Sequence, residues 1–441
     1  PLYTSLLTTD EYGLVDLLTT YTAFLSVIIG LQMSQALFRF LVTARNDNSR
    51  KQDIISTIVI ATVGVIFLYS VMFLSISGLI NIQCKWFLLA HVVATIFLQT
   101  ASGIARGLGN NTEYAAGSFI SAIVTLVLNV LFIAVLRLNI VYMLAAYAIG
   151  PLMGGIYIVL RLGVYRYIQL NHVNKKDLKM ILQYALPLVP NELSWSVIHA
   201  SDRVIVSAML SVAANGLIAV ASKFSAIYTT FFSIFNTSWT EQVVLHYKDA
   251  GGKKYVSNMF EQMVTFFGCV AIGIIACMPF VFNILVDSKF QFAYGLVPFY
   301  MIAVFFNAVI GMISAIYLIE NETKNVAIST AVAAVINIVV NILLIKRIGE
   351  YAAPVSSICG YAVISFWRLI DVNRRHCKIT MRAWNILFLI IMGTVTTVVY
   401  YTNNYFVQFI ILFAVTIGSI LVNRELLDFF LTPIIRKVKN K

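Results

Sequence analysis

Charged residues are scarce in this sequence of 441 residues. Asp, Glu, Lys and Arg together make up 11% of it, against 60% hydrophobic residues. A soluble fold could not cover so much apolar surface with so few polar side chains. Acidic residues are the scarcer kind, with 19 Asp and Glu against 31 Lys and Arg, which leaves a formal net charge of +12. We therefore expect the lipid bilayer to be the solvent for most of the chain.

Paired cysteines and nucleotide-binding motifs are also lacking. The five cysteines are scattered, so their spacing indicates neither a disulfide framework nor a metal site. His91, His199 and His246 lie on three separate segments without ligand spacing. No G-x-x-x-x-G-K-[ST] phosphate loop is present, which argues against ATP hydrolysis by the usual route. We expect no metal, no cofactor and no catalytic residues.

Long apolar segments are what the sequence has in quantity. A helix needs about 20 apolar residues to cross a hydrocarbon layer of about 30 Å. Thirteen segments are long enough, at 13–42, 53–80, 86–106, 114–137, 140–161, 181–210, 214–242, 257–286, 294–319, 325–345, 351–370, 383–401 and 405–422. The predicted fold class is an all-α polytopic membrane protein with thirteen spans in this chain.

The loops between these segments differ in positive charge. If the 43–52 loop is cytoplasmic, the alternate connections 162–180, 243–256 and 371–382 and the C-terminal tail are cytoplasmic too, and they hold most of the loop Lys and Arg residues. This asymmetry accounts for the net charge without nucleic acid, which we do not expect as a partner. An odd number of spans would leave the first residue outside the cell. We therefore expect that a first helix is missing from this sequence and that fourteen spans place both ends in the cytoplasm.

One sequence pattern occurs twice. Thr112 is followed by an apolar run that contains Asn129, then by a loop and Gly150. Thr323 is followed in the same order by an apolar run that contains Asn341, then by a loop and Gly360. A weaker echo pairs Gly13 with Gly216. Both repeated helices would run from inside to outside, which predicts two parallel, pseudo-symmetric six-helix lobes. The expected domains are an N-terminal lobe at 1–163, a basic cytoplasmic linker at 164–180, a C-terminal lobe at 181–372, and two additional helices with a basic tail at 373–441.

The segment 181–210 has the densest polar content of any predicted span. It contains Pro187, Pro190, Glu192, Asp202 and Arg203. Two prolines early in a helix remove backbone donors and kink it, which suits a moving gate helix. An ionisable residue in a span costs about 2.5 to 3.5 kcal/mol on insertion scales, so those present usually face the protein interior or a cavity.

Arg203 and Lys223 are expected at matched depth on adjacent helices, about 10 Å from the external surface. Two cations at one depth can form one site. Asp202 points about 100° away from Arg203 on the helix and could instead bridge to Lys223, and long basic side chains could also extend to the membrane interface. Arg39 and Asp16 lie near the two ends of the first predicted span. Each could likewise line a cavity or extend to the membrane interface.

Several motifs are similar to those of a known family. They are Pro1-Leu2-Tyr3 leading to Asp10-Glu11-Tyr12-Gly13-Leu14, then Leu186-Pro187-Leu188-Val189-Pro190, Ser201-Asp202-Arg203-Val204-Ile205, and Gly216-Leu217-Ile218-Ala219-Val220-Ala221-Ser222-Lys223. In order and spacing they resemble the polysaccharide (O-antigen or repeat-unit) flippases of the multidrug, oligosaccharidyl-lipid and polysaccharide exporter superfamily, over essentially the whole chain.

This resemblance implies twelve or fourteen helices in two V-arranged lobes within the bacterial plasma (inner) membrane. It implies export of an undecaprenyl-diphosphate-linked oligosaccharide from the inner to the outer leaflet, for cell-surface polysaccharide such as the O-antigen of lipopolysaccharide. Basic residues would line the central cavity, here Arg203 and Lys223, with Arg39 a weaker correspondence. A polysaccharide polymerase and other assembly proteins are the implied partners.

Two other classes of function remain open. A proton- or sodium-coupled extruder of organic cations would want acidic residues to dominate its cavity, whereas the acidic candidates above only equal the basic ones in number. A membrane-embedded polymerase or glycosyltransferase would present a sizeable outer loop or a nucleotide-sugar domain, and neither is visible. We therefore expect a flippase that works by alternating access and not an enzyme.

Overall fold

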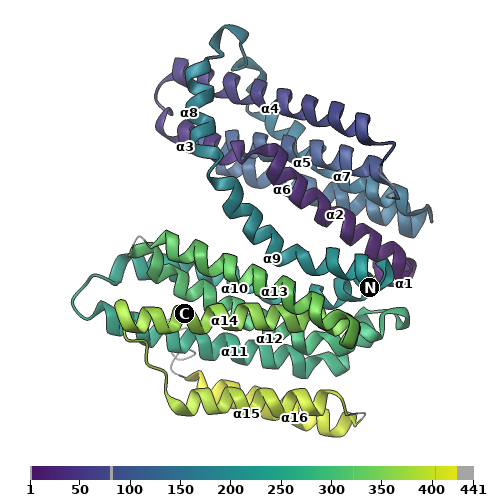
Figure 1. The fold of residues 1–441 in the computed structure, drawn as a ribbon, viewed down its shortest axis with the longest axis vertical. Helices are drawn as coiled ribbons and strands as arrows, with labels where there is room; N and C mark the ends of the chain where they lie inside the picture. The colour runs from purple at the N-terminus through teal and green to yellow at the C-terminus, as the bar shows by residue number, and fades with distance from the viewer. Residues whose placement is uncertain (1, 80–82, 321, 403, 425–441) are drawn as a thin grey trace, which may run out of the picture. The chain divides into compact units, whose positions relative to one another are not determined.

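The computed structural model describes residues 2–79, 83–320, 322–402 and 404–424, and every regular element within these residues is helical (Figure 1). The all-α prediction is therefore confirmed. The basic tail at 425–441, which the sequence places in the cytoplasm, lies outside the described residues.

The chain packs into two compact units. One unit is Leu14–Ala200, called here the first unit, and the second unit consists of Tyr3–Gly13 together with Ser201–Lys441. The chain passes from one unit to the other within two helices, α2 (Thr9–Gly30) and α9 (Leu188–Met209). The lobes expected at 1–163 and 181–372 stay a prediction.

The first unit contains one helix break that the sequence analysis did not expect. Its other helices are α3 (Met33–Thr43), α4 (Asn48–Ile76), α5 (Lys85–Gly107), α6 (Asn111–Asn129) with a π-helical turn at Val130–Val135, α7 (Ile140–Arg161) and α8 (Lys175–Ala185). The span predicted at 13–42 is divided into α2 and α3, because Leu31 and Gln32 have left-handed φ angles of 48° and 53°. An unbroken helix of that length would measure about 45 Å, longer than the hydrocarbon layer.

The segment predicted as a basic linker, 164–180, is folded against α4. It contains the 3-10 turns Val164–Arg166 and Leu170–His172 and the start of α8. Arg50 binds Asp177 through two hydrogen bonds of 2.7 Å, and His172 Nδ1 lies 2.6 Å from Asp53 Oδ1. A bidentate arginine–carboxylate pair fixes both position and orientation. This connection is therefore an ordered part of the first unit.

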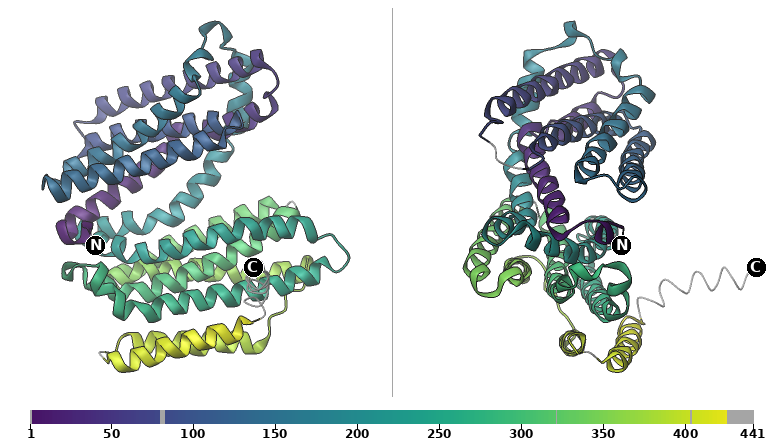
Figure 2. Two further views of the ribbon diagram at one scale, coloured as in Figure 1. Left: turned by 180° about the vertical axis from the view of Figure 1, so that it is seen from behind. Right: turned by 90° about the vertical axis from the view of Figure 1, so that its right-hand side faces the viewer.

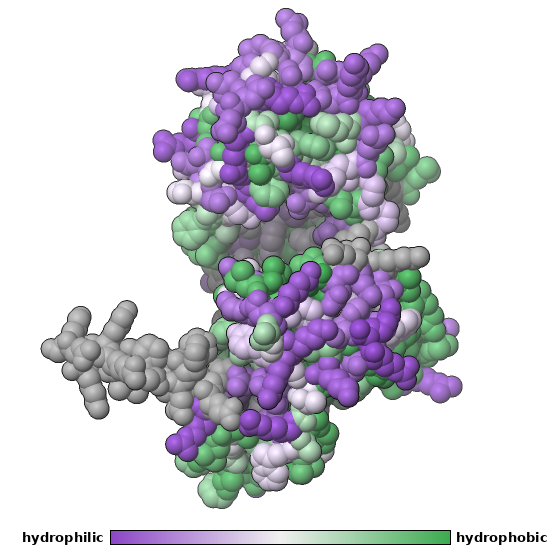
Figure 3. All heavy atoms as spheres, turned by 90° about the vertical axis from the view of Figure 1, so that its left-hand side faces the viewer, coloured by the Kyte–Doolittle hydropathy of each residue, from purple (hydrophilic) through white to green (hydrophobic). Residues whose placement is uncertain are grey.

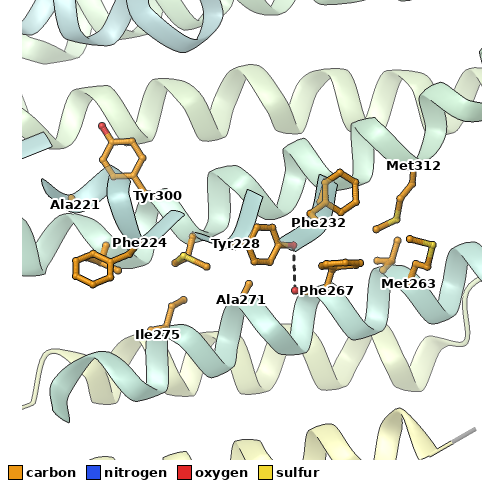
Figure 4. Packing of buried hydrophobic residues seen from close by; sticks show 14 of the residues in the cluster. Ala221, Phe224, Tyr228, Phe232, Met263, Phe267, Ala271, Ile275, Tyr300 and Met312 are labelled. Carbon is orange, nitrogen blue, oxygen red and sulfur yellow. Dashed lines mark hydrogen bonds between the residues drawn. The ribbon is translucent and has the colours of Figure 1, made fainter. Parts of the chain in front are cut away.

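The second unit has a core rich in aromatic side chains. Its helices include α1 (Leu2–Leu6), α10 (Val212–His246), α11 (Gly252–Leu285), α12 (Phe292–Ile319), α13 (Thr323–Ile348), α14 (Ala352–Arg375), α15 (Ala383–Tyr400) and α16 (Tyr405–Val422). Tyr228 and Phe232 of α10 pack edge-on against Phe267 of α11 (Figure 4). Phe224 of α10 packs against Phe282 of α11. Tyr228 donates a hydrogen bond to the Phe267 carbonyl oxygen at 3.3 Å, so its hydroxyl is satisfied within the core. α15 and α16 pack beside each other and against α11 (Figure 2).

The duplicated sequence pattern has the same packing in both units. α6 packs on α7 in the first unit, and α13 packs on α14 in the second. The glycine that ends each pattern lies against the preceding helix: a Cβ on Gly150 would lie 1.9 Å from Thr125 Oγ1, and one on Gly360 would lie 3.2 Å from the Ala333 carbonyl oxygen. Small residues at these positions let two helix backbones approach closely, as in many membrane helix pairs.

Eleven stretches of the described residues are long and apolar enough to cross a membrane. One of them, Asn325–Arg375, contains both α13 and α14, and α9 is not among the eleven. The molecule is therefore a multi-pass membrane protein, while the number of thirteen spans stays a prediction. Figure 3 looks onto one set of helix ends, where hydrophilic side chains gather, with hydrophobic side chains along the flanks.

Candidate functional site

The two prolines of the predicted gate helix mark a helix break. α8 ends at Ala185, and Pro187 lies in the turn before α9 begins at Leu188. Pro190 lies in the first turn of α9, where a missing N–H removes no helical hydrogen bond. Both prolines and the following Glu192 are exposed. The two prolines were predicted to kink one helix, whereas the structure has a turn between two helices. The role of this segment as a gate stays a prediction.

Arg203 and the helix turn that carries Lys223 are in contact in the second unit. Arg203 Nη2 donates a hydrogen bond to Ser222 Oγ at 3.2 Å, and Ser222 directly precedes Lys223 on α10. Lys223 is exposed and Arg203 is half-buried. The two cations predicted at matched depth therefore lie on neighbouring helix turns, and their role as one substrate site stays a prediction.

Asp202 turns away from this pair into a buried polar cluster between α9, α13 and α14. Its side chain is 5% exposed. Asn341 Nδ2 donates to Asp202 Oδ1 at 2.7 Å, Ser356 Oγ donates to the same oxygen at 3.3 Å, and Ser357 Oγ donates to Oδ2 at 2.8 Å. All three partners are neutral. These contacts do not support the alternative in which Asp202 bridges to Lys223.

A second layer of amide and hydroxyl groups completes the cluster. Asn337 Nδ2 donates to the Ser356 and Ser357 hydroxyl oxygens at 3.3 Å and 3.2 Å, and its Oδ1 accepts from Ser201 at 2.9 Å. Asn341 Oδ1 is buried and has no hydrogen-bond partner among the described residues. The cluster therefore combines a buried carboxylate with neutral oxygen atoms, of which Asn341 Oδ1 accepts no hydrogen bond from the described residues. Such a set of oxygen atoms can bind a proton or a hard cation.

The other predicted site residues belong to the first unit. Arg39 is exposed on α3, with its guanidinium 4.4 Å from the centre of the Tyr184 ring. Asp16 is half-buried on α2 and Glu192 is exposed on α9. The side chain of His199 lies outside the described residues. The substrate-cavity roles of Arg39, Asp16 and Glu192 stay predictions.

Sequence reasoning missed a buried arginine in the second unit. Arg368 on α14 is 1% exposed. It donates to the hydroxyls of Ser314, Ser329 and Thr330 and to the Val326 carbonyl oxygen, at 2.8 to 3.0 Å. The available signal was a charge inside the predicted span 351–370. These four hydrogen bonds to neutral partners indicate a fixed position between α12, α13 and α14.

The two repeated asparagines differ in their surroundings. Because they occupy equivalent places in the repeated pattern of a membrane protein, the sequence predicts that Asn129 and Asn341 each hydrogen-bond to a neighbouring helix. Asn341 does so through Asp202. Asn129 is buried, and neither its Oδ1 nor its Nδ2 has a hydrogen-bond partner among the described residues. The expectation is therefore confirmed for Asn341 and is wrong for Asn129 within the described part of the chain.

Comparison with solved structures shows the fold. The structure of "Lipid II flippase MurJ, inward closed conformation" is 16% identical with a TM-score of 0.67, and the match covers 95% of this chain and 98% of that one. An inward-facing multidrug resistance MATE family transporter of the MOP superfamily is 15% identical with a TM-score of 0.64, over 85% of this chain and 93% of that one. An outward-facing MATE family transporter of the same superfamily has a TM-score of 0.58 at 15% identity, over 85% of this chain and 89% of that one.

A comparison with protein families identifies the chain more closely. The family model described as "Polysaccharide biosynthesis protein" matches residues 1–240, which is more than half of the 441 residues. No curated protein matches the chain. With the fold of a MOP-superfamily transporter and this family match, the chain belongs to the polysaccharide biosynthesis protein family.

Proposed function

We propose that this protein is a flippase for undecaprenyl-diphosphate-linked oligosaccharide units. It would move them from the cytoplasmic to the outer leaflet of a bacterial plasma membrane, for the synthesis of cell-surface polysaccharide such as O-antigen. The family match and the likeness in fold to a lipid II flippase support this assignment. The observation that carries it is the contact of Arg203 with the α10 turn before Lys223.

The proposed role of Arg203 and Lys223 is to bind the diphosphate or acidic sugars of the substrate. A diphosphate and many hydroxyl groups cannot enter hydrocarbon unpaired without a cost of many kcal/mol. Guanidinium and ammonium groups form the strong, charge-assisted hydrogen bonds that such anions need. Alternating exposure of this site to the two faces of the membrane would carry the head group across without an open leak.

Asp202 would couple this movement to an ion gradient. The chain contains no recognisable phosphate loop, so we expect the energy to come from a gradient, from a partner or from the substrate. The buried cluster around Asp202 can take up a proton or an alkali cation at a residue next to Arg203 in sequence. A change of charge at Asp202 would then change the position of α9, the helix that also carries the proposed substrate-binding residue Arg203. We expect no enzymatic activity, and we propose a polysaccharide polymerase as a partner.

The second candidate is a proton- or sodium-coupled extruder of organic cations. The buried carboxylate of Asp202 and the likeness in fold to MATE family transporters favour it. Two basic residues at the candidate substrate site disfavour it, because a cationic substrate would be repelled there.

Charge removal at the candidate site tests the proposal. In cells that depend on this protein, we expect Arg203→Ala and Lys223→Ala each to leave lipid-linked oligosaccharide on the cytoplasmic face. A hydrogen bond to a charged group contributes about 1.5 to 3 kcal/mol, so we expect a loss of about ten- to a hundredfold in translocation rate. The measurement is leaflet-resolved accumulation at equal membrane levels of each variant.

The matched control is Lys346→Ala, which removes an exposed lysine from the last turn of α13. This variant should translocate as the parent does. If Arg203→Ala and Lys223→Ala also keep the parent rate, the proposed substrate site is wrong. Loss of organic-cation efflux with an unchanged oligosaccharide distribution would favour the second candidate.

A further inference from the structure

A pocket of about 450 Å³ lies where α11, α12, α15 and α16 meet, and it shares no residue with the site above. It is formed by the end of α11, the start of α12, the end of α15 and the start of α16. The distribution of Lys and Arg places these helix ends on the outer side of the membrane. Its volume is within the range of small-molecule sites, about 300 to 1,000 Å³.

Four tyrosines line this pocket, and two of them form a rigid wall. The rings of Tyr294 and Tyr400 are stacked, with centroids 4.2 Å apart and planes 12° apart. The Tyr400 hydroxyl donates to the Tyr294 carbonyl oxygen at 2.6 Å, and the Tyr294 hydroxyl donates to the Tyr400 carbonyl oxygen at 3.1 Å. Tyr401 and Tyr405 are 47% and 62% exposed. The pocket therefore combines a fixed aromatic wall with two accessible rings.

Apart from Thr402 and the tyrosine hydroxyls, the polar side chains of the pocket are amides. Asn283, Gln291 and Gln408 line it, and none of its described lining residues is charged. Gln408 is only 6% exposed, and its amide nitrogen donates to the Thr402 carbonyl oxygen at 2.6 Å and to the Tyr400 carbonyl oxygen at 3.4 Å. These bonds fix the orientation of the amide. Its Oε1 oxygen is buried and has no hydrogen-bond partner within the described part of the chain.

These features select one chemical class of ligand. A lining without charge gives no counter-ion to a phosphate, a carboxylate or an ammonium group. Amide groups and an unused carbonyl oxygen match a ligand with several hydroxyl groups, and exposed aromatic rings match one with an apolar ring face. A belt of tyrosines at the membrane interface would account for Tyr401 and Tyr405. It would not account for the buried, oriented amide of Gln408.

We propose that this pocket is a saccharide-binding site on the outer side of the membrane. A neutral sugar ring would pack on Tyr401 or Tyr405, and one of its hydroxyl groups would donate to Gln408 Oε1. This inference goes beyond the proposed transport function, because it assigns to α15 and α16 a binding role that translocation through Arg203 and Lys223 does not require.

The test measures sugar binding to the purified full chain in lipid nanodiscs, prepared without glycosidic detergents because maltosides would compete. The probes are the methyl glycosides of glucose, galactose, mannose, rhamnose and N-acetylglucosamine, observed by saturation-transfer NMR. We expect at least one glycoside to bind and Tyr405→Ala and Tyr401→Ala each to weaken its binding about tenfold. Gln408→Leu removes the acceptor and should weaken binding to a similar extent.

Two further variants separate specific binding from general effects. Tyr405→Phe keeps the ring and should bind as the parent does. Tyr142→Ala removes an exposed tyrosine from α7 in the first unit and should also leave binding unchanged. The proposal is overturned if none of the glycosides binds, if binding survives the changes at Tyr401, Tyr405 and Gln408, or if Tyr142→Ala weakens it equally.

Discussion

Asp202 is a buried carboxylate that accepts hydrogen bonds from three neutral side chains. Burying an ionised carboxylate is costly unless a cation or a set of donors compensates for lost hydration. Two hydroxyls and an amide supply those donors here, while the adjacent Arg203 is bonded to Ser222. A group in this situation changes its energy strongly when it gains or loses a proton or cation, which is what a coupling residue requires.

Removal of this charge should uncouple transport. Asp202→Asn keeps the shape of the side chain, so we expect the protein to fold. We expect the parent to translocate substrate faster in membrane vesicles that carry a proton or sodium gradient than in vesicles treated with ionophores. The variant should show the same rate in both. The measurement is the ratio of the two rates for each protein.

Asp287→Asn is the control for this experiment. Asp287 is a carboxylate outside the cluster, whose side chain caps the turn at Ser288–Phe290. The variant should keep the gradient dependence of the parent. An Asp202→Asn protein that responds to the gradient as strongly as the parent would show that coupling does not pass through this residue.

The sequence identified part of the candidate site. Arg203, Lys223 and Asp202 stood out because ionisable residues are rare in apolar segments. Of the partners of Asp202, Asn341 was noted in the repeated pattern, but Ser356 and Ser357 were not. Their contacts with Asp202 could not be predicted, because the three residues lie 139 to 155 residues from Asp202 along the chain. Neither periodicity nor spacing reports contacts at such separations.

Helix α2 crosses the start of α10 at a pair of glycines. A Cβ on Gly13 would lie 1.9 Å from the Val212 carbonyl oxygen, and a Cβ on Gly216 would lie 2.1 Å from the Thr9 carbonyl oxygen. Asn215 Nδ2 donates to the Gly13 carbonyl oxygen at 2.9 Å. The weak sequence echo between Gly13 and Gly216 thus corresponds to a reciprocal contact within the second unit.

Any side chain at this crossing should destabilise the fold. In Gly216→Ala, the added methyl group meets backbone atoms, which can move only with the whole helix. Overpacking of this kind typically costs about 1 to 3 kcal/mol. We expect a lower temperature of thermal unfolding in nanodiscs. Gly273→Ala is the control, because a Cβ there has no neighbour within 4 Å, and the better helix propensity of alanine should leave stability equal or slightly higher.

Equal stability of Gly216→Ala and Gly273→Ala would contradict the close crossing.

At the scale of elements, the sequence predicted helices well and their interruptions less well. The break at Leu31 and Gln32 was missed, because neither residue ordinarily favours a left-handed φ. At Pro187 a kink within one helix was predicted, because proline removes a backbone donor, whereas the structure has a turn between two helices.

For the whole molecule, composition and the lengths of the apolar segments were together sufficient to predict an all-helical membrane protein. Few charges and many apolar residues leave no other solvent than lipid, and only a helix or closed barrel satisfies its backbone there. The family match and the likeness to MOP-superfamily transporters agree with that reading. Composition does not report the substrate, which we propose is bound by a few residues, among them Arg203 and Lys223.

The central claim is that this chain by itself moves a lipid-linked oligosaccharide across a bilayer. The most direct measurement uses liposomes that contain the purified full chain and undecaprenyl-diphosphate oligosaccharide with a labelled sugar, to which a membrane-impermeant glycosidase is added. If the claim is right, the digested fraction rises from the fraction of labelled lipid that lies in the outer leaflet to nearly all of the labelled lipid. A fraction that stays at the share of the outer leaflet, in liposomes that nevertheless transport an organic cation, would contradict it.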